Sequence, residues 1–305
     1  MTNNAGTQAA AASQPGHGNL RSIAAMVASM LVFSLSDVMM KIVGAAMPLG
    51  QLLVLRGAIA TLFIIGIAWG TGALRHLPMV ASPMVIWRTV AEILCSVLYF
   101  VALVRLSLAD VAAISQFAPL AVMAGAALLL GEPVGWRRWT AAAVGFLGVL
   151  LIVKPGTGAF QPMSLAMLAS MVFVAARDLI TRRLPVGIPN VLVTGAAIVG
   201  VMLAGLVLAL FETWPPPTPQ QWMMLVLSGI AVIAGFMLGL IAMRTGDVAV
   251  VQPFRYSFVV FGAIASLLVF KDVPDRISVV GILMIVASGL YSLHRERVRR
   301  REARA

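Results

Sequence analysis

The chain has 305 residues, of which 61% are hydrophobic and 11% are charged, and its formal net charge at pH 7 is +11. Soluble domains carry about 25% charged residues, so a chain with so few polar groups cannot cover the surface of a soluble fold. The composition therefore predicts an integral membrane protein, and the single cysteine, Cys95, excludes an internal disulfide framework.

Along the chain, the first 19 residues are small and polar, which predicts a disordered N-terminal segment. They lack the basic start of a signal peptide, so we expect no cleavage. Ten apolar segments follow, each close to the length of about 20 residues that crosses a bilayer core. In chain order they are 22–45, 49–70, 84–104, 108–130, 138–154, 162–182, 189–211, 221–243, 248–270 and 277–293.

The basic residues predict the orientation of these segments. An even number of spans places both ends on one side, and most short-loop arginines fall on that side, as does the six-arginine tail within residues 294–305. Cytoplasmic loops carry an excess of Lys and Arg. We therefore expect a multi-pass membrane protein with both termini in the cytoplasm. The positive charge then meets anionic lipid headgroups, and nucleic-acid binding is not expected.

The sixth apolar segment repeats the first. ASMLVFSLSDVMMK in the first aligns without a gap with ASMVFVAARDLITR in the sixth, which matches Asp37 with Asp178 and Lys41 with Arg182. Further on, ADVAAISQF resembles GDVAVVQPF, and GEPVGW corresponds to FKDVPD. Chance similarity between apolar segments is the alternative, but charged positions match as well as apolar ones.

The repeat divides the chain into two halves of five helices, residues 20–154 and 162–293. Because five is odd, consecutive copies enter the membrane from opposite sides and form an inverted repeat. Secondary transporters use this architecture, since exchanging the conformations of the halves moves the cavity opening from one side to the other. The predicted fold is therefore all-α, with ten transmembrane helices in two inverted five-helix repeats.

These halves resemble a known family. GEPVGWRRW after the fourth segment, QPFRYSFVVFGAI in the ninth and FKDVPDRISVVGILMIVASGLYSLHRER into the tenth are similar to the EamA family of the drug/metabolite transporter superfamily. The resemblance implies a ten-helix carrier of the bacterial inner membrane for amino acids, vitamins, nucleotide-like cofactors or drugs, with a cavity lined by helices 1, 3, 4, 6, 8 and 9. Among bacterial relatives, the chain resembles the branch that includes riboflavin and S-adenosylmethionine uptake carriers. The second half has FKDVP where the family has a Gly-Glu pair, so a role for that Glu transfers only to Glu132.

Charges inside apolar segments are the first candidates for a site, because each costs about 2.5–3.5 kcal/mol at the centre of a span. Asp37/Lys41 and Arg88/Glu92 have i,i+4 spacing, so the two members of each pair share a helix face. Such pairs line a polar cavity or only lock helices together, and the sequence leaves both readings open. Asp37 or Glu92 would carry a proton in a coupled carrier.

Pro119 and Pro253 interrupt the fourth and ninth segments at matching positions, and a freed backbone carbonyl inside a membrane is tolerated where it lines a cavity. Neighbouring glutamines could hydrogen-bond a substrate, and neighbouring aromatic rings could stack on a flat one. The predicted substrate-binding residues are Asp37, Glu92, Tyr99, Gln116, Phe117, Gln252, Phe254, Arg255 and Tyr256.

Glycines predict close helix packing in the fifth and tenth segments. Gly145 and Gly148 lie in GFLGVLL, and Gly281 and Gly289 lie in GILMIVASG. Small residues let helices approach closely, so these segments are expected to pack tightly, and they also suit a homodimer contact.

Enzymatic chemistry finds no support in the sequence. The three histidines, His17, His76 and His294, lie in a tail, a loop or a span end, and the chain has no H-E-x-x-H, G-x-S-x-G or P-loop motif. No cofactor or metal is expected. The favoured function is uptake of a flat, partly aromatic metabolite such as riboflavin or S-adenosylmethionine. The alternatives are an amino-acid or drug exporter and a non-transporting membrane scaffold or receptor.

Overall fold

The computed structural model describes residues 15–131, 134–157, 160–185, 187–245 and 251–302, and all secondary structure in these ranges is helical. Two expectations concern residues outside these ranges: the family role of Glu132, and the N-terminal segment, of which residues 1–14 are not described. The elements of the first half are α1 (Pro15–Gly44), α2 (Leu49–Gly70), η1 (Ala73–Ala81), α3 (Pro83–Arg105), α4 (Leu108–Ser115), α5 (Ala118–Leu130) and α6 (Trp136–Val153). Those of the second half are α7 (Met163–Arg182), α8 (Asn190–Ala209), α9 (Pro219–Thr245), η2 (Gln252–Tyr256), α11 (Ser257–Ala265), η3 (Ser266–Phe270) and α12 (Arg276–Glu302).

In the described part of the chain, eight helical stretches are long and apolar enough to cross a membrane. One of them joins α4 and α5, and another joins η2, α11 and η3. The fifth and tenth predicted spans correspond to two shorter apolar stretches, Trp139–Val153 and Arg276–Ser292. The protein is therefore an all-helical membrane protein, and its fifth and tenth helices have shorter apolar stretches than the other eight.

The two prolines break their helices as predicted. Between α4 and α5, the backbone N–H groups of Gln116 and Phe117 donate to carbonyls three residues back, which tightens the turn before Pro119. In the second half, Pro253 lies in η2, a short 3₁₀ segment that precedes α11. Proline has no N–H and cannot continue an α-helical hydrogen-bond ladder. The fourth and ninth spans are therefore both interrupted at matching positions.

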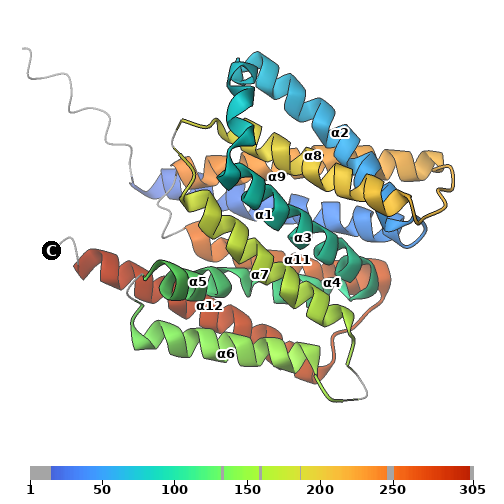
Figure 1. The fold of residues 1–305 in the computed structure, drawn as a ribbon. Helices are drawn as coiled ribbons and strands as arrows, with labels where there is room; N and C mark the ends of the chain where they lie inside the picture. The colour runs from blue at the N-terminus through green and yellow to red at the C-terminus, as the bar shows by residue number, and fades with distance from the viewer. Residues whose placement is uncertain (1–14, 132–133, 158–159, 186, 246–250, 303–305) are drawn as a thin grey trace, which may run out of the picture.

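The helices pair in a pattern that respects the repeat (Figure 1). The most extensive pairs are α1 with α9, α2 with α8, α3 with α7, and α6 with α12, and α4 also packs against α11. When each helix is replaced by its counterpart in the other half, the α1–α9 pair becomes the α7–α3 pair, and each of the other pairs stays the same. This is the pairing that a pseudo-two-fold axis between the halves requires, and it confirms the internal repeat.

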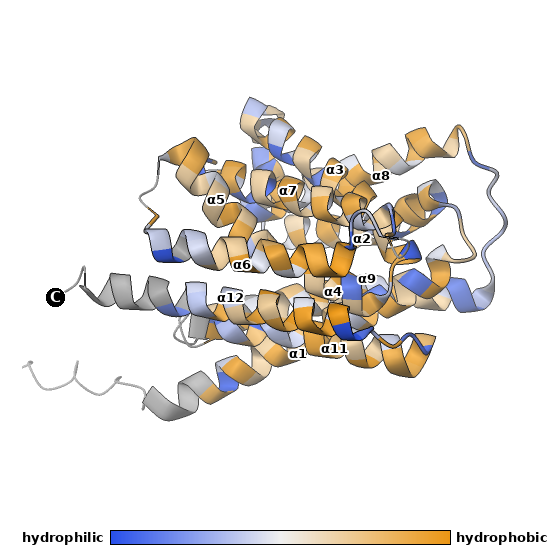
Figure 2. Ribbon diagram, turned by 90° about the horizontal axis from the view of Figure 1, so that it is seen from below, coloured by the Kyte–Doolittle hydropathy of each residue, from blue (hydrophilic) through white to orange (hydrophobic). Residues whose placement is uncertain are grey.

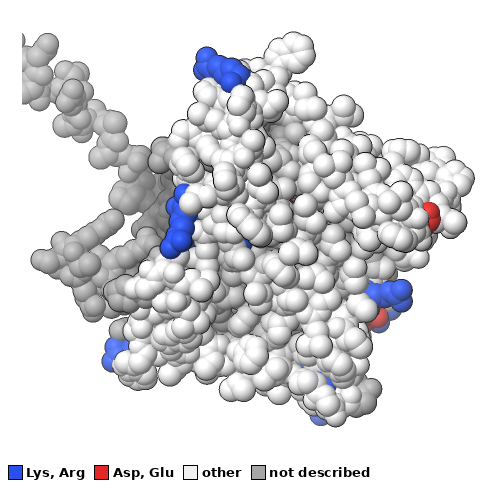
Figure 3. All heavy atoms as spheres, viewed as in Figure 1, with Lys and Arg blue, Asp and Glu red and all other residues white. Residues whose placement is uncertain are grey.

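The start of α1 and the end of α12 lie at the same end of the bundle, on the left of Figure 1. We call this the terminal end and the other the distal end. The ribbon is apolar through the middle of the bundle (Figure 2), and on the face in Figure 3 the charged atoms lie almost entirely around the rim. An uncharged band between charged ends is the surface that a lipid bilayer covers.

The buried core is concentrated toward the distal end. Met40 and Val43 near the end of α1 pack with Leu103 and Leu106 at the end of α3 and with Val153 of α6. A smaller cluster at the terminal end joins Met26 and Met30 of α1 to Ala242 of α9 and Val251. The larger buried cluster, which contains residues of both halves, therefore lies toward the distal end of the bundle.

The glycines of α6 and α12 face one another, as the sequence predicts. A Cβ added to Gly148 would lie 2.7 Å from the carbonyl oxygen of Gly281, and one added to Gly281 would lie 2.5 Å from that of Gly148. Only glycine permits this approach. The small residues thus serve the α6–α12 pair within one chain, where the sequence alone also suggested a dimer contact.

Candidate functional site

A charged cluster lies among the first three helices, and we call Asp37, Arg56, Tyr99 and Phe100 the Asp37 cluster. The Tyr99 hydroxyl of α3 donates a 2.6 Å hydrogen bond to Oδ2 of Asp37 on α1. The Arg56 guanidinium of α2 lies over the Phe100 ring, 4.8 Å from its centroid. Asp37, Arg56 and Tyr99 are partly accessible. The structure thus brings together two predicted residues, Asp37 and Tyr99, and adds Arg56.

Lys41 does not belong to this cluster, although it lies one turn after Asp37. Its ammonium donates to the carbonyls of Leu103, at 3.1 Å, Val104, at 3.5 Å, and Leu106, and it lies 5.3 Å from the Phe270 ring centroid. The last carbonyls of a helix lack intrahelical partners and favour a nearby cation. Lys41 therefore caps the end of α3, and no ion pair joins it to Asp37 among the described residues.

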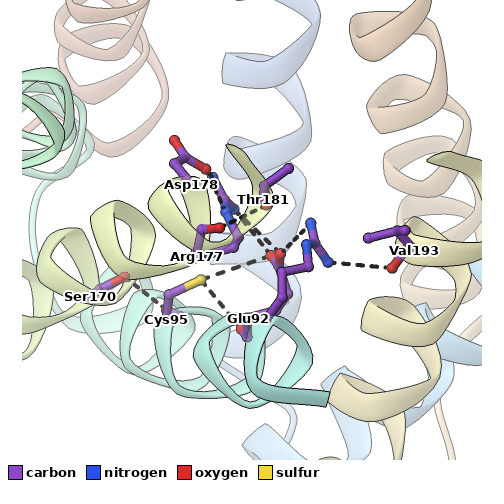
Figure 4. A network of polar contacts seen from close by, with 8 residues as sticks. Glu92, Cys95, Ser170, Arg177, Asp178, Thr181 and Val193 are labelled. Atoms are coloured by element: carbon purple, nitrogen blue, oxygen red, sulfur yellow. Dashed lines mark hydrogen bonds and ion pairs between the residues drawn. The ribbon is translucent and has the colours of Figure 1, made fainter. Parts of the chain in front are cut away.

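A second cluster joins α3 and α7 (Figure 4), and we call Arg88, Glu92, Arg177 and Asp178 the Glu92 cluster. Glu92 forms ion pairs with Arg88, at 3.1 Å, and with Arg177, at 3.2 Å. Arg177 also contacts Asp178 at 2.8 Å. The predicted Arg88–Glu92 pair is therefore present, but a second arginine from the other half shares its carboxylate.

Neighbouring groups hold the Glu92 cluster in place. The Ser170 hydroxyl donates to the Cys95 carbonyl at 2.8 Å, and the Arg88 guanidinium donates to the Val193 carbonyl at 3.4 Å. Arg88 Nε is buried and has no hydrogen-bond partner among the described residues. The cluster thus ties α3 of the first half to α7 and α8 of the second.

Arg255 and Phe254 of η2 occupy a different environment. Both side chains are exposed, which places a cation beside an aromatic ring on the accessible surface of this segment. Gln252, one turn earlier, is partly buried.

The structure places three other predicted residues outside the Asp37 cluster and the Glu92 cluster. The Phe117 ring contacts Phe146 of α6, with the centroids 5.8 Å apart. Tyr256 is buried, and its hydroxyl occupies the space where a Cβ of Gly289 on α12 would lie. Gln116 is buried at the break between α4 and α5. Phe117 and Tyr256 therefore pack against α6 and α12.

A polar cavity of about 430 Å³ opens at the distal end. Its charged lining includes Asp110 and Asp272, and the Lys154–Asp275 ion pair lies at its edge. Lys154 and the backbone N–H of Ser278 both donate to Asp275, which holds the pKa of that carboxyl below its usual range. Asp110 lies in the first turn of α4 and Asp275 directly precedes α12, so both carboxylates also stabilise helix N-termini. Among the described residues, no group of His, Cys, Asp and Glu is arranged to hold a metal ion.

Known proteins resemble the chain over most of its length. The model of the EamA-like transporter family matches residues 20–154 and 161–293. The "Pseudopaline exporter CntI" of Pseudomonas aeruginosa is 27% identical over 86% of this chain and 92% of its own length. A solved crystal structure superposes with a TM-score of 0.61 at 22% identity, covering 89% of this chain and 96% of the other, which shows a shared fold.

Two kinds of uptake carrier match over shorter stretches. The "S-adenosylmethionine uptake transporter" of Rickettsia prowazekii is 26% identical over 59% of this chain and 60% of its own length. The "Riboflavin transporter" of Rhizobium johnstonii is 30% identical over 62% of this chain and 63% of its own length. With two matched domains that span nearly the whole chain, this protein belongs to the EamA-like transporter family and is a membrane transporter of small metabolites, not an enzyme.

Proposed function

We propose that the chain is a secondary transporter of the bacterial inner membrane that works by alternating access, with both termini in the cytoplasm. The symmetric pairing of the helices supports this most directly, because two interchangeable halves are what alternating access needs. The Glu92 cluster joins the two halves through ion pairs within the bundle. Such pairs can break and re-form as the halves move.

The proposed substrate is a flat or partly aromatic metabolite that also carries charged groups. Tyr99 and Phe100 next to Asp37 and Arg56, and exposed Phe254 next to Arg255, combine ring faces with charges. Such combinations bind flat ligands with polar ends. S-Adenosylmethionine and riboflavin fit this description, and uptake carriers named for each are similar to this chain.

Export is the second candidate for direction. The relative named as an exporter covers 86% of this chain, whereas those named for uptake cover about 60%. This coverage supports export as the alternative direction, and an amino acid or a drug is then the alternative substrate. The family assignment argues against a non-transporting scaffold.

Asp37 is the stronger candidate for proton coupling. Glu92 is shared by two guanidinium groups, whereas the hydrogen-bond partner of Asp37 is a neutral phenol. A carboxylate without a tight cation partner can lose and regain a proton with less rearrangement. Asp37→Asn should then abolish the response of transport to a pH gradient.

Flux into proteoliposomes that contain only the purified protein tests the proposal. We expect labelled S-adenosylmethionine or riboflavin to cross in a saturable manner, and each to be competed by flavins or adenosyl compounds rather than by small aliphatic amino acids. Loading the substrate inside or outside gives the direction. Competition by threonine or homoserine alone would assign the chain to amino-acid export, and the absence of any flux would contradict the carrier proposal.

A further inference from the structure

Arg56 has more hydrogen-bond donors than the protein satisfies. It lies seven residues after the start of α2, about 10 Å along the helix, well inside the span Leu49–Gly70. A guanidinium presents five N–H donors and cannot give up its charge. Within the described residues its direct contact is with the face of Phe100, and no acceptor bonds to it.

Asp37 lies near Arg56, through the adjacent residues Tyr99 and Phe100 that contact each of them, but it forms no ion pair with Arg56 among the described residues. The two charges interact, yet no pair of their charged atoms lies within the 4.0 Å of an ion pair among the described residues. Tyr99 holds one oxygen of Asp37, Oδ2, and leaves Oδ1 without a described hydrogen-bond partner. Opposite charges inside a bundle usually pair directly, so two charges that lie near the same aromatic pair without an ion pair between them are candidates for holding a ligand.

The side chains of Asp37 and Arg56 are each held by a neighbouring residue of α3. Tyr99 orients the Asp37 carboxylate, and the Phe100 ring supports one face of the Arg56 guanidinium. Tyr99 and Phe100 are adjacent on α3, with ring centroids 5.7 Å apart in an edge-to-face arrangement. The result is one anion and one cation, each held by a neighbouring ring of α3, and both residues are partly accessible.

We infer that Arg56 and Asp37 recognise the zwitterionic end of an α-amino acid, with the substrate carboxylate on Arg56 and its ammonium on Asp37. A carboxylate fits the planar fork of a guanidinium with two parallel hydrogen bonds. The ammonium group satisfies the free oxygen of Asp37. This rests on the proposed transport function and narrows its substrates to those with an amino-acid end, which includes S-adenosylmethionine and leaves out riboflavin.

Thermal stabilisation of the purified protein tests the assignment with three probes: S-adenosylmethionine, its decarboxylated analogue and riboflavin. For the unaltered protein, we expect S-adenosylmethionine to bind roughly 10-fold or more tightly than the decarboxylated analogue, because charge-assisted hydrogen bonds are lost. Arg56→Gln should remove this preference. Arg56→Lys, which keeps the charge but not the fork, should retain part of it.

Arg75→Gln is the matched control, since Arg75 is exposed in η1 outside the predicted spans, and it should keep the full preference. Equal binding of S-adenosylmethionine and its decarboxylated analogue, or binding of neither, would overturn the assignment. The melting temperature without ligand shows whether Arg56→Gln still folds. If it does not fold, the binding preference of Arg56→Lys tests the assignment instead. Saturable riboflavin flux that is unchanged in Arg56→Gln would leave the carrier proposal intact and overturn only the amino-acid assignment.

Discussion

At the scale of single residues, Lys41 shows how a buried charge serves the fold. Its side chain is 8% exposed, and its ammonium meets the carbonyls that end α3. Lys41→Met keeps the apolar stem but removes these donors, and buried carbonyls are costly to leave unsatisfied. We expect a loss of about 1–3 kcal/mol in the free energy of unfolding, measured as a lower melting temperature in detergent.

Lys271→Met is the control for Lys41→Met. Lys271 is exposed just after η3, so its replacement removes the same charge without uncovering buried carbonyls. Its melting temperature should stay close to that of the unaltered protein. An equal loss in both variants would show that net charge, and not the capping of α3, sets the stability.

In the candidate site, the sequence singles out the charged residues but not their partners. Asp37, Glu92 and Arg255 stand out in the sequence because charges are costly inside apolar segments. Their partners depend on which helix faces the charge, and the sequence spacing suggested Lys41 for Asp37, where the structure has Tyr99 and Arg56. Aromatic residues are less distinctive, because a ring such as Phe117 or Tyr256 serves packing as well as binding.

At the scale of helices, the contact between α6 and α12 depends on the absence of side chains. In Gly281→Ala, the new Cβ would lie 2.5 Å from the Gly148 carbonyl oxygen and 2.9 Å from a side-chain carbon of Ile152. Both helices would have to separate, and overpacking of this kind costs about 1–3 kcal/mol. We expect a lower melting temperature and weaker expression of folded protein, seen by fluorescence-detected size exclusion.

Gly66→Ala in α2 provides the comparison for Gly281→Ala. No atom lies within 4 Å of a Cβ built there. Alanine is a better helix former than glycine by up to about 1 kcal/mol, so this variant should be neutral or slightly more stable. Similar losses at both positions would contradict the close-packing explanation.

At the scale of the whole molecule, the start of α1 and the end of α12 lie at one end of the bundle (Figure 1). The arginines gathered at that end predict that it faces the cytoplasm. Reporter fusions at Asn19 and after Arg297 should therefore both give a cytoplasmic signal, for example high fluorescence from a green fluorescent protein and no activity from a periplasmic phosphatase. A periplasmic signal from both fusions would reverse the orientation, and signals on opposite sides would contradict the shared end.

The sequence by itself determined the membrane class, the helical segments, the proline breaks and the repeat. Each of these depends on local chemistry: apolar length, a missing N–H, and matched charges at a constant spacing. Only the tertiary structure decided that Lys41 caps α3, that Arg177 shares Glu92 with Arg88, and that Arg56 faces Asp37 without touching it. These contacts join helices that are far apart in the chain, and their geometry depends on how the helices pack and rotate against one another, which no spacing within a single helix records.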